Sequence, residues 1–204
     1  MDQQTLDLPT ATKRRFSKGL VALAAAAALS LGGAGAAYAA TGHTTGEYDA
    51  WEVHIHDGEI ELHTHGHDNA PWDDGDWFVT DNDGFIYGPW DSPDLEVGFS
   101  TEDAYAGTGF TGSITFTITD VTYDDGSNPP DDGTLIVRNA GGANELFNTG
   151  ASDFSESFGS GTQHDHWEWE FADGSGTYEV TVAASSTGSF FDASDPYTVT
   201  FVVP

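Results

Sequence analysis

The stretch 51–65 reads WEVHIHDGEIELHTH, two runs of alternating residues joined by Asp57-Gly58. In the first run the odd-numbered positions are apolar and the even-numbered positions are polar, and in the second run this parity is reversed. A period of two is the signature of a half-buried β-strand. Asp-Gly between two such runs is the turn dipeptide of a two-residue hairpin. The stretch therefore predicts an antiparallel hairpin with histidine and glutamate on one face.

The turn also predicts the register of this hairpin. A two-residue loop sets three directly opposed pairs: His56 with Glu59, His54 with Glu61, and Glu52 with His63. His54 and His63 are then diagonal neighbours about 7 Å apart. Since Zn–N bonds are about 2.0–2.1 Å long, both imidazoles can reach one ion from that spacing.

The same alternation recurs along the rest of the chain and predicts further strands at 77–79, 85–87, 114–119, 135–137, 166–171, 178–182 and 197–202. Asp-Gly dipeptides and Ser/Gly-rich stretches separate these runs, and we find no amphipathic helical segment after residue 39. The pattern predicts an all-β fold, a single antiparallel two-sheet β-sandwich of immunoglobulin-like type.

The first 39 residues have the layout of a secretory signal peptide. Basic residues at 13–15 and 18 precede an apolar, alanine-rich stretch at 20–31, and Ala37-Tyr38-Ala39 fits a small-x-small cleavage site. The apolar stretch is too short for a membrane span. We therefore expect a signal peptide at 1–39 and one β-sandwich domain at 40–204. Export would follow the general secretory or the twin-arginine route. The mature protein is expected outside the cytoplasm, secreted or at the cell surface, with no membrane span.

The charge and the lack of cysteine exclude several classes of binding partner and metal ligand. After removal of residues 1–39 the chain keeps Arg138 against 32 acidic residues, a formal charge of −31. Such a surface repels nucleic acid and anionic membranes, so we exclude both as partners. Two causes of the charge stay open: adaptation to a salty medium, where charges are screened, or a field that concentrates cations. The chain has no cysteine, so disulfides and thiolate ligands are excluded.

Histidine and carboxylate are then the strong metal ligands that remain. A second segment, His164-Asp165-His166, places two imidazoles at i and i+2 of a strand. Imidazole with carboxylate suits zinc best, with nickel, copper and manganese as alternatives. The candidate ligands are His164, His166, His63, His65, His67, His54 and His56. A composite site requires the hairpin and the 164–171 segment to meet, which the sequence does not decide. The alternatives are a solvated polar face and histidines that brace a loop by hydrogen bonding.

Three blocks of the chain carry a resemblance to a known family. They are the opening Asp49 with its Asp-Gly hairpin, the block 98–102 followed by the run 113–121, and His164, His166, Trp169 and Phe171 followed by Gly176 and Tyr178. In order and spacing these resemble the choice-of-anchor M domain, an actinobacterial-type surface-anchored protein domain. Phe99 stands where the family has tryptophan. Family members usually carry an anchor, whereas we expect none after Pro204.

The resemblance implies partners rather than chemistry. The family tends to occur beside metal-uptake transporters, which suggests capture of zinc or manganese in partnership with a metal ABC-transporter system or a cell-wall component. It implies no enzymatic activity, and the chain has no cysteine nucleophile, no Gly-x-Ser-x-Gly elbow and no H-E-x-x-H helix. We therefore expect a non-enzymatic metal-binding protein.

A surface module without metal is the alternative function. It would bind protein, or glycan on a platform of exposed aromatics such as Trp72, Trp90, Tyr105 and Tyr123. Asp-rich turns such as 81–84 and 124–126 leave a weak calcium site as a further alternative.

Overall fold

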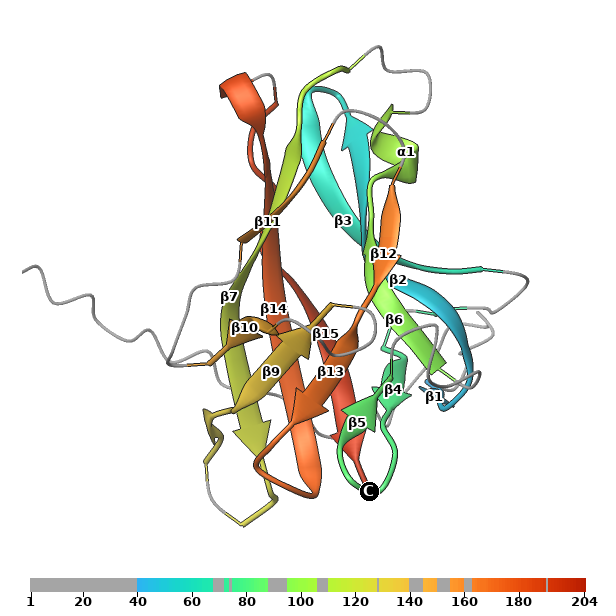
Figure 1. The fold of residues 1–204 in the computed structure, drawn as a ribbon, viewed down its shortest axis with the longest axis vertical. Coiled ribbons are helices and arrows are strands. Elements are labelled where there is room, and N and C mark those ends of the chain that lie inside the picture. The colour runs from blue at the N-terminus through green and yellow to red at the C-terminus, as the bar shows by residue number, and fades with distance from the viewer. Residues whose placement is uncertain are drawn as a thin grey trace, which may run out of the picture. The chain divides into compact units, whose positions relative to one another are not determined.

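A computed structural model describes residues 40–67, 72–73, 75–87, 95–105, 110–127, 129–139, 145–149, 155–159, 163–189 and 191–204. The expected signal peptide and Trp90 lie outside these ranges. The described residues form fifteen strands, one turn of α-helix, α1 (Glu102–Tyr105), and one 3₁₀ turn, η1 (Thr187–Ser189). The prediction of an all-β protein is confirmed (Figure 1).

The largest sheet has seven strands. Its order is β1 (Gly42–His43), β4 (Trp77–Val79), β15 (Tyr197–Val203), β14 (Gly176–Ser186), β7 (Ile114–Asp124) and β11 (Ser155–Phe158), with β8 (Asp131–Asp132) also paired to β7. The long β7, β14 and β15 form its antiparallel centre, where alternate residues are buried. This regular alternation is the reason that the sequence predicts these three strands well.

Two four-stranded sheets complete the described fold. One has the order β10 (Glu145–Asn148), β9 (Leu135–Arg138), β13 (Glu168–Phe171) and β5 (Phe85–Ile86). The other has the order β12 (His164–His166), β6 (Leu95–Ser100), β2 (Gly46–His56) and β3 (Glu59–Gly66). The described strands thus form three hydrogen-bonded sheets rather than the predicted two.

The prediction of purely antiparallel pairing is wrong. The pairs β1–β4, β4–β15 and β2–β6 are parallel. The expected continuous strand 166–171 is also divided at Trp167, since β12 pairs with β6 whereas β13 pairs with β9 and β5. Side-chain alternation reports which residues face the core, and it carries no information on strand direction or on a change of sheet.

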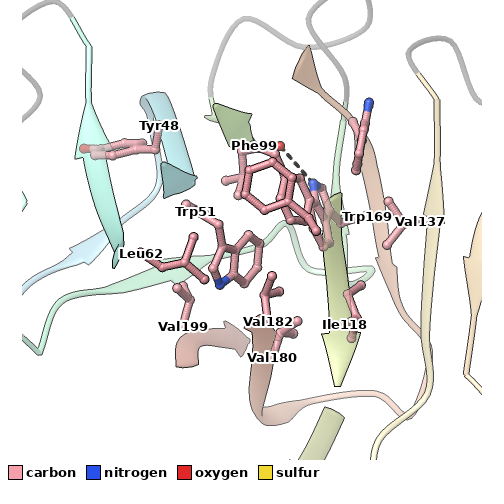
Figure 2. Close-up of a cluster of buried hydrophobic side chains, with 14 of the residues drawn as sticks. Tyr48, Trp51, Leu62, Phe99, Ile118, Val137, Trp169, Val180, Val182 and Val199 are labelled. Carbon is pink, nitrogen blue, oxygen red and sulfur yellow. Dashed lines mark hydrogen bonds between the residues drawn. The ribbon is translucent and has the colours of Figure 1, made fainter. Parts of the chain in front are cut away.

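Aromatic side chains join the three sheets into one core. Trp51 stacks on Phe99 with ring centroids 4.9 Å apart, and the Trp169 indole donates a hydrogen bond to the carbonyl of Val97 at 2.9 Å (Figure 2). Phe99 contacts Phe116 of β7, and Phe171 of β13 contacts Phe201 of β15. Both four-stranded sheets therefore pack on the same face of the seven-stranded sheet.

The hairpin β2–β3 follows the register that its turn predicts. Asp57 has φ 52° and Gly58 has φ 91°, so both central residues adopt the positive φ of a type I′ turn. The three predicted pairs, His56–Glu59, His54–Glu61 and Glu52–His63, are all present. This part of the prediction is confirmed.

Among the described residues, no helix has both the length and the apolar character needed to cross a membrane.

Candidate metal centre

The sheet β12-β6-β2-β3 brings the two histidine segments together (Figure 1). Residues opposed across its four strands form two parallel rows on one face. The first row is His166, Gly98, Asp49 and His65, and the second is His164, Ser100, Glu52 and His63. The strand β6, inserted between β12 and β2, is what joins segments about 100 residues apart in the chain.

A bulge in β2 keeps acidic residues on this face. Asp49 pairs with His65 and Glu52 with His63, so three steps along β2 match two steps along β3. The extra residue in β2 shifts by one position the alternation of its side chains between the two faces of the sheet. Glu47 and Asp49 before the bulge, and Glu52 and His54 after it, therefore point to the same side of the sheet as the histidines.

Gly98 leaves the space that His166 occupies. A Cβ atom at position 98 would collide with the carbonyl oxygen of Asp165 and lie 2.8 Å from Cδ2 of His166. Without a side chain at Gly98, the His166 ring crosses β6 toward Asp49, and its Nε2 lies 3.5 Å from the Asp49 carboxylate.

Five residues form what we call the first cluster: Glu47, Asp49, His67, His164 and His166. One donor atom from each of Glu47, His67 and His164 lies within 4.8 Å of the other two. The three imidazole rings are neighbours, with His164 centroids 5.3 Å from His67 and 5.2 Å from His166. Donor atoms of a single zinc ion lie within about 4 Å of one another, because each bond is about 2.0–2.1 Å long. A small side-chain adjustment thus suffices for shared coordination.

Two buried polar atoms of the first cluster, Nε2 of His166 and Oδ1 of Asp49, make no hydrogen bond to the described residues. They face each other at 3.5 Å, an ion-pair distance that is too long for a good hydrogen bond. The side chain of His166 is 4% exposed and that of Asp49 is fully buried. A buried polar atom without a partner costs about 1–3 kcal/mol, so such atoms are rare and call for a cause. A bound cation would satisfy both.

The backbone holds His67 over this position. The N–H of His67 donates to the carbonyl of Glu47 at 2.9 Å. Its Nε2 lies 2.7 Å from Oδ2 of Asp49, within hydrogen-bond distance. The residue that follows β3 is therefore fixed against the strand that carries the acidic ligands.

The electrostatics of the first cluster favour a cation. Burial raises the pKa of Asp49, but His166 and His67 beside it outweigh burial and leave the pKa below its ordinary value. Burial lowers the pKa of His67, and Asp49, with Glu47 and Glu102 nearby, reverses this and leaves the pKa raised. Each shift reflects attraction between carboxylate and positive charge.

Two further carboxylates border the first cluster. Glu102 Oε1 lies 3.2 Å from Nδ1 of His164, and Glu96 Oε2 lies 3.6 Å from Nδ1 of His166. Such outer carboxylates orient imidazoles that ligate a metal and raise their basicity. With these two, four carboxylates face three imidazoles, an excess of negative charge that a divalent ion would offset.

The predicted ligands separate into three groups. His67, His164 and His166 come together in the first cluster, as the convergence hypothesis requires. His54, His63 and His65 lie around Glu52, at the other side of the bulge, and His65 also stacks on His67 with centroids 5.3 Å apart. His56 is 71% exposed, and its nearest carboxylates are 3.9 Å away.

The sequence alone does not distinguish the acidic members of the site. Glu47, Asp49 and Glu102 do not stand out in a chain with 34 acidic residues. One signal was present: Glu47 and Asp49 sit at i and i+2 immediately before the hairpin. Without the bulge, however, continued alternation would place them on the face of Trp51.

The described aromatic and aspartate residues of the alternative sites have structural roles. Trp72, Tyr105 and Tyr123 are partly buried against the core, rather than gathered on an exposed platform. In the Asp-rich turns, Asp81 accepts backbone N–H groups of Asp83 and Phe85. Asp124 likewise accepts the N–H of Gly126. Turn hydrogen bonds thus account for these aspartates without an ion.

No protein-family model, no curated protein and no solved structure matches this chain. The resemblance to the choice-of-anchor M domain therefore stays a prediction from the sequence motifs.

Proposed function

We propose that this protein is a non-enzymatic, extracytoplasmic protein that binds one divalent transition metal ion, zinc, in the first cluster. The observation that carries the proposal is the buried pair His166 Nε2 and Asp49 Oδ1, which face each other at 3.5 Å without a hydrogen bond, next to the donor atoms of Glu47, His67 and His164. Imidazole and carboxylate donors without thiolate suit zinc, and they bind manganese more weakly than zinc, nickel or copper.

The biological role is proposed on the sequence motifs. The signal-like residues 1–39 support export, and the choice-of-anchor M resemblance supports a partnership with a metal ABC transporter or the cell wall. The protein would hold the ion at the cell surface or deliver it for uptake. An immunoglobulin-like sandwich is proposed for the domain on the same motifs and on its layered β-structure.

Calorimetric titration of the metal-free protein with zinc tests the binding proposal. His164→Ala removes a half-exposed ligand without emptying the core, and we expect zinc affinity to fall at least ~10-fold, the loss typical even of residues that support a metal ligand. His56→Ala is the matched control, because His56 lies on the same sheet face outside the first cluster, and it should bind zinc as the unmodified protein does. Absence of zinc binding in the unmodified protein, or equal binding by both variants, would overturn the proposal.

A further inference from the structure

The side chains around Glu52 form a second cluster, which consists of Glu52, His54, His65 and Asp103. One donor atom from each of Glu52, His54 and Asp103 lies within 4.8 Å of the other two. Nε2 of His54 is 3.3 Å from Glu52 Oε2 and 3.5 Å from Asp103 Oδ2. Nδ1 of His65 is 2.8 Å from the same Glu52 oxygen.

The second cluster repeats the plan of the first. Each is built on a buried carboxylate flanked by two imidazoles: Asp49 by His67 and His166, and Glu52 by His65 and His54. The carboxylate of Glu52 is 3% exposed. Burial raises its pKa, but hydrogen bonds and positive charge from His54 and His65 leave the pKa below its ordinary value. A buried carboxylate of this kind requires a positive partner.

The second cluster is more open to solvent than the first. Its outer members are half exposed, with side-chain exposure of 37% for His54, 52% for His65 and 51% for Asp103. A depression lined by Glu52, His54, His63, Thr64, His65, Gly66 and Trp72 lies against it. His63 adds a third imidazole at its edge, with its ring centroid 4.8 Å from that of His54. An ion bound here would keep solvent-facing coordination positions.

We infer that the second cluster is a second divalent-metal site, weaker than the first, so that the protein binds two ions on one face of the sheet. The rings of His65 and His67 stack at an interplanar angle of 5°, which places the two sites side by side. The less exposed first site holds its ion longer, and the more exposed second site exchanges its ion with solvent faster. This inference rests on the proposed function. It adds that the protein binds two ions and that the second ion exchanges with solvent.

Native mass spectrometry and calorimetry of the full protein with zinc test this inference. The unmodified protein should bind two zinc ions, with the second at least ~10-fold more weakly. His54→Ala and Asp103→Asn change half-exposed side chains, so both variants are expected to fold, as circular dichroism would verify. Each should bind one zinc ion with the affinity of the tight site.

His56→Ala serves as the control on the same face and should keep both ions. One zinc ion in the unmodified protein, or two in both second-cluster variants, would overturn the second site while leaving the first intact. In contrast, no bound zinc at all would overturn the proposed function itself. The two failures are therefore distinguishable in one experiment.

Discussion

At the scale of single residues, the first cluster depends on one position that has no side chain. Gly98 allows the His166 ring to lie across β6 beside the fully buried Asp49. The chemistry comes from His166 and Asp49, but the space comes from Gly98. A residue that contributes no donor atom therefore determines whether the donors meet.

Gly98→Ala should impair both folding and zinc binding. The added methyl collides with the Asp165 backbone and the His166 ring, so we expect β12 to shift and the free energy of unfolding to fall by about 1–3 kcal/mol. Zinc affinity of the folded protein should fall at least ~10-fold. Gly159→Ala is the control, since a Cβ there meets nothing within 4 Å. Chemical denaturation and calorimetry measure both effects, and a neutral Gly98→Ala would refute the packing argument.

Zinc binding should weaken in acid, beginning above the ordinary histidine pKa of about 6.5. Burial lowers the pKa of His67, but the carboxylate of Asp49 raises it by a larger amount, so the net pKa is raised. Protons therefore compete with zinc for this ligand at a higher pH than they would for a free imidazole. Acid has the opposite effect on the stability of the metal-free protein. The raised pKa stabilises the fold at pH below about 6.5, and this contribution is lost as pH rises through the folded pKa.

Calorimetric titrations between pH 5.5 and 8 measure the first effect, and thermal unfolding with chelator over the same range measures the second. Zinc affinity that does not change with pH would exclude imidazole as a main ligand.

At the scale of elements, the hairpin β2–β3 is the part that local rules determine. Asp57-Gly58 sets the turn type, the turn sets the register, and alternation sets the faces. All three were predictable, because each depends on residues close together in the chain.

Gly58→Ala should weaken this element without touching its neighbours. Gly58 has φ 91°, a conformation that costs an L-residue about 1–2 kcal/mol, while nothing lies within 4 Å of an added Cβ. The free energy of unfolding should fall by about that amount. Gly159→Ala, equally open but without positive φ, should change it by less than ~0.5 kcal/mol. Equal effects in urea denaturation would argue against the type I′ turn as the cause.

The rest of the site could not be predicted from local pattern. The convergence of His67 with His164 and His166 depends on β6, which pairs parallel with β2 and antiparallel with β12. Neither partner of β6 follows from its own residues. The bulge that turns Asp49 outward is a mismatch between two strands, so it is not visible in either strand alone. Candidate histidines were predictable, whereas their acidic partners were not.

At the scale of the whole molecule, the large negative net charge favours the binding of a cation at the proposed metal site. Residues 40–204 carry 32 acidic residues and one arginine. Arg138 is held between Glu168 and Glu170 at 3.0 and 2.5 Å, so it offsets little charge elsewhere. Such a field raises the local concentration of cations. Adaptation to salt also accounts for the overall charge, but it does not require imidazoles clustered on one sheet face.

The metal-free protein should become more stable as monovalent salt is added. At a Debye length of about 3 Å in molar salt the carboxylates no longer repel one another over long distances. We expect the midpoint of thermal unfolding to rise by several degrees between 0.05 and 1 M NaCl with a chelator present. Differential scanning calorimetry measures this shift, and a midpoint that is flat or falls with salt would contradict self-repulsion as a major force.

The most direct test of the account is anomalous diffraction at the zinc edge from crystals grown with zinc. We predict a peak about 2.0–2.1 Å from Nε2 of His166, from a nitrogen atom of His67 or His164, and from a carboxylate oxygen of Asp49. A zinc-loaded crystal with no peak between these side chains, or with zinc bound only at scattered surface carboxylates, would contradict it.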